Sequence, residues 1–226
     1  MIFKTEGIVL NYVKFRETSI IVKIYTKTFG LKTYIVNSVR SAKSKTNKIA
    51  YYQALTLLDL VIYNRANKDI NRISEVKILH PYRSIPFDHK KNLIGIFLSE
   101  ILAKLLKEEE EDIPLFNFIK QSIIHFDSQD KLFENFHILF LIKMANYLGF
   151  APQTPKDFCR FPGAENAQEQ VFFGILSQLF NSDFEDYVET SGKVRSQILE
   201  FLLKFYQYQI DGFGEVKSLQ IIKELH

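Results

Sequence analysis

The sequence predicts an α+β protein in which a small five-stranded β-barrel is followed by an all-helical domain. Up to residue 80, short runs rich in β-branched residues alternate with turns. From residue 92 onward, apolar residues recur at the three- and four-residue spacing of helices. Pro81 and Pro86 lie between the two patterns and indicate a linker or a sharp junction. We therefore expect one domain over 1–80 and another over 81–226.

Five segments of the first part are predicted strands, at 5–10, 19–25, 32–39, 55–63 and 70–79. The turn at 26–31 contains Gly30, which can adopt a positive φ, and 64–69 is a polar turn. Five short strands fit a closed or nearly closed barrel, because closure removes exposed sheet edges. An OB-fold barrel is the natural candidate, since it combines five strands with a nucleic-acid face. An SH3-like barrel would give a similar pattern.

Six helices are predicted in the second part, over 92–106, 115–125, 131–148, 167–180, 194–210 and 216–225. Gly149 and Pro152 follow the third helix and are typical stop signals. Five consecutive acids at 108–112 would be unfavourable at the C-terminus of a helix, so the first helix is expected to end near Lys107. These acids are otherwise expected to be a solvated surface.

The charge is unevenly distributed along the chain. Residues 1–80 carry 14 Lys/Arg and 5 Asp/Glu, a balance of +9, whereas the rest carries −6 and the total is +3. A basic first third indicates a polyanionic partner, of which nucleic acid is the commonest. The alternative is a scatter of solvated charge without a partner.

The single cysteine, Cys159, allows neither an internal disulfide nor a zinc site built on several cysteines. The N-terminus lacks the apolar core of a signal peptide, and no apolar run reaches the roughly 18 residues of a membrane span. We therefore expect a cytoplasmic protein without a metal or cofactor. No P-loop, Gly-Xaa-Ser-Xaa-Gly or His-Glu-Xaa-Xaa-His motif occurs, and a non-enzymatic protein is expected.

The candidate binding residues lie in the basic segment 40–48 and on the strands beside it. Four cations with hydroxyls and an amide between them suit phosphate oxygens and do not select a base sequence. By the period of two along a strand, Lys23 shares a side with Tyr25, and Lys32 with Tyr34. A face of cations and aromatic rings is typical of single-strand binding, although these tyrosines could instead belong to the core. The expected DNA-binding residues are Arg16, Lys23, Lys32, Tyr34, Arg40, Lys43, Ser44, Lys45 and Lys48.

Several segments occur in a characteristic order along the chain. They are Lys4-Thr5-Glu6-Gly7-Ile8-Val9-Leu10, Glu17-Thr18-Ser19, Tyr25-Thr26, Phe29-Gly30-Leu31-Lys32, Val39-Arg40-Ser41-Ala42-Lys43-Ser44-Lys45, residues 53–60, and near the end residues 205–213 and 217–219. In this order and at these separations they resemble the RecO family of DNA-repair proteins.

The resemblance implies an OB-fold joined to a helical domain in a recombination mediator of the RecF pathway. Such a protein would bind single- and double-stranded DNA, anneal complementary strands and assist RecA loading on DNA coated with single-stranded-DNA-binding protein. The implied protein partners are RecR, the C-terminal tail of single-stranded-DNA-binding protein and, indirectly, RecA. The alternative is a protein adaptor with an OB-like barrel that binds no DNA. A metal-dependent nuclease would need a convergent cluster of acids or histidines that the sequence does not indicate.

One feature departs from the family pattern. Many relatives carry a four-cysteine, zinc-finger-like insertion after a Leu-Gly-Phe-Xaa-Pro stretch. Here Leu148-Gly149-Phe150-Ala151-Pro152 is present, but only Cys159 follows. The insertion is therefore expected to be missing or degenerate, and a role for zinc is not carried over.

Overall fold

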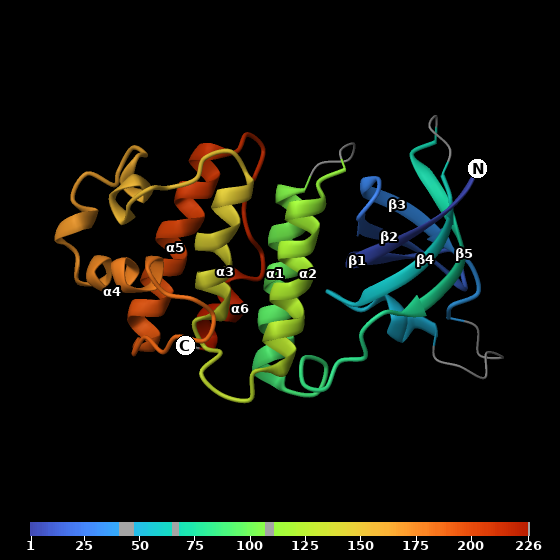
Figure 1. Ribbon diagram of the computed structural model, residues 1–226, viewed down its shortest axis with the longest axis horizontal. Coiled ribbons are helices and arrows are strands. Elements are labelled where there is room, and N and C mark those ends of the chain that lie inside the picture. Colours follow the sequence, from blue (N-terminus) through green and yellow to red (C-terminus); the bar gives the residue numbers. More distant parts are fainter. Residues whose placement is uncertain (41–47, 65–67, 107–110, 226) are drawn as a thin grey trace. The chain divides into compact units, whose positions relative to one another are not determined.

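The computed structural model describes residues 1–40, 48–64, 68–106 and 111–225. It divides into two compact units, Met1–Ile124 and His125–His226. The first unit contains the five strands and the first helix, together with most of the second (Figure 1). The second unit contains the remaining helices. The α+β architecture predicted from the sequence, a barrel followed by helices, is confirmed.

The barrel closes in the strand order β1-β2-β3-β5-β4, with β4 returning to β1. All neighbouring strands are antiparallel except β3 and β5, which are parallel. A closed five-stranded barrel in this order is OB-like, which decides between the two barrels that the sequence left open. The strands are β1 (Ile2–Phe15), β2 (Ser19–Thr26), β3 (Gly30–Val36), β4 (Leu57–Tyr63) and β5 (Ile70–Ile78).

The long strand β1 closes the barrel because it pairs with two neighbours in succession. Its first half pairs with β4 and its second half with β2, and at Gly7 it pairs with both, opposite Leu58 and Thr26. A register shift between Val9 and Asn11 marks a bulge just beyond this point, where a strand bends more easily. A Cβ at Gly7 would lie 2.7 Å from Cγ2 of Ile24 and 2.8 Å from Cδ1 of Leu60. Only glycine fits there.

The interior of the barrel is filled by branched aliphatic side chains with two buried tyrosines. A 3-10 helix, η1 (Lys48–Tyr52), adds to this core, and its Tyr52 is fully buried. The sequence did not predict η1, because five residues are too few to show a period. The core comprises Val9, Ile20, Val22, Ile24, Tyr34, Val39, Tyr52, Leu58, Leu60 and Ile62.

Two helices complete the first unit, α1 (His89–Leu105) and α2 (Ile113–Ser128). Asp88 caps α1 by accepting a hydrogen bond from the backbone N–H of Lys91 at 3.0 Å. On the barrel side, the hydroxyl of Ser99 donates to the carbonyl of Leu10. From α2, Nζ of Lys120 lies 2.6 Å from a carboxylate oxygen of Glu6. These contacts fix both helices against β1.

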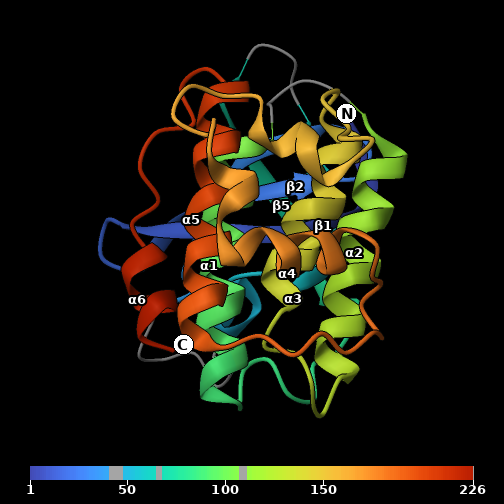
Figure 2. The ribbon, with the colours of Figure 1, turned by 90° about the vertical axis from the view of Figure 1, so that its left-hand side faces the viewer.

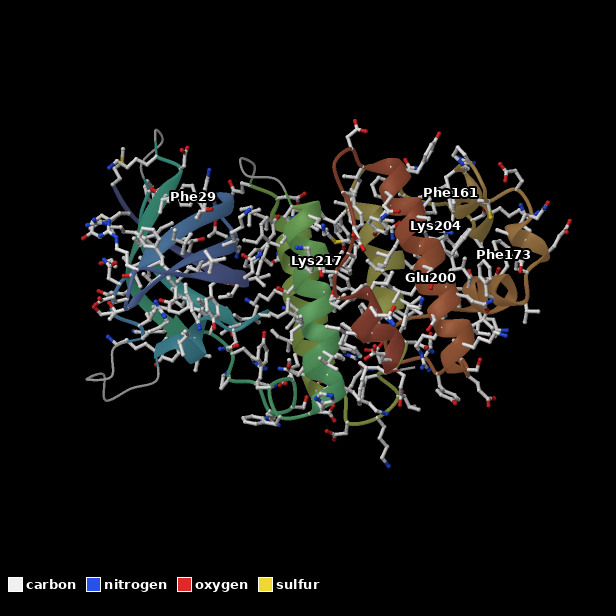
Figure 3. The ribbon with its side chains drawn as sticks, turned by 180° about the vertical axis from the view of Figure 1, so that it is seen from behind. Phe29, Phe161, Phe173, Glu200, Lys204 and Lys217 are labelled. Atoms are coloured by element: carbon white, nitrogen blue, oxygen red, sulfur yellow. The ribbon has the colours of Figure 1, made fainter. Side chains whose placement is uncertain are left out.

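The second unit is built around α3 (Phe136–Met144), whose side chains are almost all buried. The other α-helices of this unit are α4 (Val171–Phe180), α5 (Gly192–Gln209) and α6 (Leu219–Glu224), and Figure 2 shows α4 and α5 with α3. Three 3-10 turns occur among the described residues of this unit, η2 (Ala145–Tyr147), η3 (Pro155–Cys159) and η4 (Ala167–Glu169). Phe161 packs against Phe201 with ring centroids 5.3 Å apart, and Glu200 pairs with Lys223. Figure 3 labels Phe161 and Glu200 among the side chains of this unit.

Two of the predicted helices are wrong at their ends. The helix expected over 131–148 is α-helical only from Phe136 to Met144, because Leu132 has a positive φ of 62° and the last turn tightens into η2. The helix expected over 167–180 is interrupted by an extended residue, Gln170, before α4 begins. Apolar spacing continues through both breaks, so it could not reveal them.

Two glycine substitutions are expected to have opposite effects on stability. Gly7→Ala forces a Cβ into the barrel core and should lower the free energy of unfolding by about 1–3 kcal/mol. Gly95 lies inside α1, where a Cβ would meet Ile85 and Leu55 at an ordinary 3.6 Å. Gly95→Ala should therefore raise stability by up to about 1 kcal/mol through helix propensity. Urea unfolding of both variants checks this, and equal effects would contradict it.

Tyr206 is expected to link the stability of the protein to alkaline pH. Its hydroxyl is buried and donates to the carbonyl of Leu141 at 2.7 Å, and burial raises its pKa well above the ordinary value. The neutral phenol is favoured in the fold, so this contribution is complete below about pH 10 and is lost as the pH rises further. Tyr206→Phe should cost about 0.5–1.5 kcal/mol at neutral pH and make the alkaline loss of stability shallower. Chemical denaturation at several pH values measures both effects.

Candidate nucleic-acid interface

A groove runs along the outside of the barrel where β3 and β5 meet. The two strands pair in parallel, with Thr33 opposite Ile70 and Ile35 opposite Arg72. The groove encloses about 410 Å³, and η1 forms one of its walls. We call it the seam groove. It is lined by Ile35, Val36, Asn37, Val39, Lys48, Tyr51, Tyr52, Arg72, Ile73, Ser74 and Val76.

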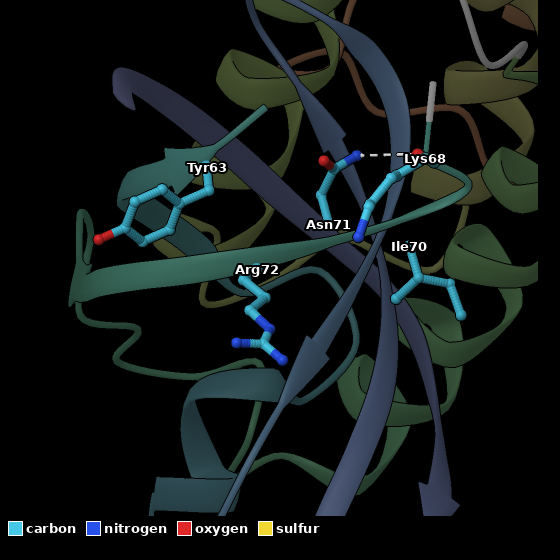
Figure 4. Close-up of a pocket in the computed structure, with 5 residues that line it drawn as sticks. All are labelled: Tyr63, Lys68, Ile70, Asn71 and Arg72. Carbon is cyan, nitrogen blue, oxygen red and sulfur yellow. Dashed lines mark hydrogen bonds between the residues drawn. The ribbon is translucent and has the colours of Figure 1, made fainter. Parts of the chain in front are cut away.

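A second hollow of about 340 Å³ continues along the same strand (Figure 4). Arg72 lines both hollows and therefore joins them. Asn71 donates from Nδ2 to the carbonyl of Lys68 at 3.3 Å, which fixes the start of β5. The ring of Tyr63 is 40% exposed at the end of β4. The hollow is lined by Tyr63, Lys68, Ile70, Asn71 and Arg72.

The chemistry of this surface suits a single strand of nucleic acid. Lys48, Lys68 and Arg72 can contact phosphate oxygens, while Tyr51 and Tyr63 present rings on which bases can stack. None of the described residues that line either hollow is acidic. Neither kind of contact depends on base sequence.

The structure places the cations that were predicted to bind DNA in different environments. Lys48 lines the seam groove and is exposed at the start of η1. Arg16 is exposed in the turn between β1 and β2, with its guanidinium 5.2 Å from the centre of the Phe15 ring. Lys43, Ser44 and Lys45 lie outside the described residues. Of this segment, only Lys48 lines the groove among the residues that are described.

Arg40 holds the turn between β1 and β2. Its backbone N–H donates to the carbonyl of Thr18 at 3.1 Å, and Nε donates to the carbonyl of Ser19 at 3.3 Å. Its Nη2 donates to the carbonyl of Arg16, the residue whose φ is 51°. Arg40 was expected to bind DNA, yet two of its guanidinium nitrogens, Nε and Nη2, donate to carbonyls of the protein.

The prediction that Tyr34 offers a ring to DNA is wrong. Lys32 and Tyr34 share a side of β3, as their spacing predicted, but their partners on β2 are the core residues Ile24 and Val22. This side faces the inside of the barrel. Tyr34 is 1% exposed, and burial raises the pKa of its hydroxyl. Lys32 is half-buried on the same side.

Lys23 and Tyr25 share the opposite, outer side of β2, and here helix α2 covers the tyrosine. The Tyr25 ring packs against Phe116 of α2 with centroids 5.8 Å apart and is 3% exposed. Lys23 stays half-buried beside it. Strand periodicity therefore paired these residues correctly, but it could not show which side is covered.

Sequence reasoning missed the residues that give this surface its shape. Tyr63 and Arg72 pair across β4 and β5, Lys68 comes just before β5, and Tyr51 comes from η1, which lines the same groove as Arg72. Lys68 and Arg72 contributed to the basic charge of the first 80 residues. That charge was the one available signal, and it did not locate them.

A basic OB-like barrel with grooves lined by cations and tyrosines, followed by helices, resembles the OB-folds that bind oligonucleotides. The family model described as Recombination protein O N terminal matches residues 1–82, and the one described as Recombination protein O C terminal matches residues 86–171. The chain belongs to the RecO family of DNA repair proteins.

Relatives over the whole length support this membership. DNA repair protein RecO of Flavobacterium psychrophilum is 33% identical over 239 residues, which cover 100% of this chain and 99% of the relative. The RecO protein of Flavobacterium johnsoniae is 34% identical over 236 residues with the same coverage. The RecO protein of Bacteroides fragilis strain YCH46 is 32% identical over 241 residues, again with 100% and 99% coverage.

Two further observations concern metals and membranes. Within the described ranges, no group of three or more His, Cys, Asp or Glu side chains could hold a metal ion. Cys159 is a free thiol in η3, and burial raises its pKa. None of the described helices has the length and apolar character needed to cross a membrane.

Removal of the Arg40 side chain is expected to lower stability more than removal of the Lys48 side chain. Arg40→Ala removes hydrogen bonds from the turn between β1 and β2 and should lower the free energy of unfolding by about 1–2 kcal/mol. Lys48→Ala removes an exposed side chain and should change stability by less than about 0.5 kcal/mol. Denaturant melts of the two variants provide the measurement. A Lys48→Ala loss as large as that of Arg40→Ala would show that both residues are structural.

Proposed function

We propose that this chain is a non-catalytic recombination mediator that binds single- and double-stranded DNA on its barrel. It anneals complementary strands and assists RecA loading on DNA coated with single-stranded-DNA-binding protein. Membership of the RecO family supports a role in DNA repair. The observation that carries the proposal is the seam groove, which brings Lys48, Tyr51 and Arg72 together on one face.

The geometry suggests how a strand is held. Lys48 and Arg72 neutralise phosphates and release counterions, so affinity should fall steeply as salt rises. Tyr63, which pairs with Arg72 across β4 and β5, lines the second hollow and offers a stacking ring. Contacts of this kind ignore base identity, which suits a protein that must act at any damaged site.

The proposed protein partners are RecR and the acidic C-terminal tail of single-stranded-DNA-binding protein, with RecA as an indirect partner. Exchange of one DNA-bound protein for another needs simultaneous access to the strand and to the protein being displaced. A barrel that contacts the backbone of DNA leaves the other surfaces of the chain for these proteins. The expected location is the cytoplasm, at the nucleoid.

The proposal predicts that reversing two groove cations weakens DNA binding. Lys48→Glu combined with Arg72→Glu should lower affinity for fluorescent single-stranded DNA at least about tenfold. It should also make the dependence of log affinity on log salt shallower by roughly 0.7 for each phosphate that the variant no longer neutralises. Tyr63→Ala should lower affinity with little change in this slope, because a base stack contributes about 1–3 kcal/mol without a charge. Fluorescence anisotropy at several salt concentrations measures both variants beside the wild type.

The matched control is Lys156→Glu combined with Lys193→Glu, which changes the net charge equally at exposed sites of the second unit. Equal weakening by both double variants would indicate a general charge effect and remove the groove from the proposal. Wild-type protein that fails to bind at low salt would favour the adaptor without DNA. Cleavage of labelled DNA in Mg²⁺ or Mn²⁺ would contradict the non-catalytic assignment.

A further inference from the structure

The barrel closes between β3 and β5 over a short stretch only, and the rest of β5 keeps an unpaired edge. β5 pairs with β3 from Ile70 to Arg72, whereas it pairs with β4 as far as Ile78. Beyond Arg72, none of the strands that the structure describes pairs with β5 on the side opposite β4. An unpaired strand edge is a template on which another strand can add. We call residues 73–78 of β5 the free edge.

The register of β5 shows which backbone groups face the open side. The backbone N–H of Leu79 donates to the carbonyl of Leu57 at 2.9 Å. Antiparallel partners alternate between pairs that exchange hydrogen bonds and pairs that do not. Counted from this pair, Lys77 bonds to β4, whereas Val76 and Ile78 direct their backbone N–H and C=O groups away from β4. The free edge therefore offers donors and acceptors to a further strand.

The free edge belongs to the seam groove. Ser74 and Val76 line this groove together with Lys48 of η1. Glu75 and Lys77, the neighbours of Val76 on β5, are exposed to solvent. A strand added to the free edge would therefore lie in the same groove that carries the proposed DNA site.

The charges of β5 select a second copy of the same strand as the occupant, in one register. When two free edges pair antiparallel about a two-fold axis at Val76, Glu75 of each copy lies opposite Lys77 of the other. An axis shifted by one residue would place Glu75 opposite itself or Lys77 opposite itself, and like charges directly opposite are unfavourable. The hydrogen-bond phase agrees with the first register, because Val76 of each copy presents its backbone groups outward.

The neighbours on β4 are compatible with this register. Lys77 lies opposite Asp59, and Glu75 lies opposite Val61. In the paired edges, each Lys77 would thus lie between Asp59 of its own chain and Glu75 of the second copy, one cation between two acids. A lysine in an edge strand ordinarily discourages pairing, and here Glu75 of the second copy would neutralise it.

We propose that the free edge pairs with the free edge of a second copy of this chain, antiparallel and centred on Val76, and that this pairing covers the seam groove. DNA and the second copy then compete for the groove, so self-association regulates access to it. The competition rests on the proposed function, whereas the pairing does not. Because few residues pair, the contact is weak and reversible, as a removable cover must be.

The test of the pairing uses sedimentation of the full chain without DNA. The wild type should show a reversible, concentration-dependent dimer. Glu75→Lys and Lys77→Glu each place like charges opposite one another, and each alone should weaken the dimer at least about tenfold. An equimolar mixture of the two variants should recover the dimer, because every pair across the interface is then of opposite charge. Recovery also shows that both variants are folded.

The matched controls are Glu189→Lys and Lys156→Glu, which make the same charge changes at exposed residues of the second unit. Each control, and their mixture, should dimerise as the wild type does. A wild type that stays monomeric, or controls that weaken the dimer as much as the β5 variants, would overturn the pairing. So would a mixture of the two β5 variants that remains monomeric while each unfolds in urea as the wild type does.

The test of the competition adds single-stranded DNA to the wild-type dimer. Sedimentation should show DNA-bound monomers in place of dimers. Dimers that bind DNA without dissociating would overturn the competition. Absence of DNA binding at low salt would overturn the proposed function and the competition with it, while the measurements without DNA still decide the pairing.

Discussion

Closure of the barrel by one strand is the constraint on which the rest of the first unit depends. β1 pairs with β4 in its first half and with β2 in its second half, and Gly7 pairs with both. A Cβ at Gly7 would collide with the side chains of Ile24 and Leu60. Because β1 already pairs with both β2 and β4, β5 has only β3 left as its second neighbour. The parallel pairing of β3 with β5 creates the seam groove, so the candidate site follows from a packing requirement on the far side of the barrel.

The sequence predicted the barrel, its five strands and the helices after it, because each of these depends on a local pattern. The alternation of side chains along β2 and β3 even paired Lys23 with Tyr25 and Lys32 with Tyr34 correctly. It could not tell the inside of a closed barrel from the outside, nor show that α2 covers part of the outside. Both tyrosines are consequently buried.

The candidate site was harder to predict than the fold because strand pairing and the position of η1, not spacing along the chain, bring its members to one surface. Tyr51 is on η1, Tyr63 ends β4, and Arg72 lies on β5. The cation-rich segment 40–48 includes Lys48, which lines the seam groove. Its charge could not show that Arg40, two residues after the positive φ of Ser38, turns back to hold the β1–β2 turn. Residue type predicts the chemistry that is available, and only the fold decides whether a side chain is free to use it.

Two grooves of the first unit share one short element. Lys48, Tyr51 and Tyr52 of η1 line the seam groove, whereas Ala50 and the residues that follow η1 line another groove beside the start of α1. Tyr52 is buried in the barrel core, and a close-packed core resists displacement. η1 therefore lies between these two grooves, and its buried tyrosine keeps their spacing fixed.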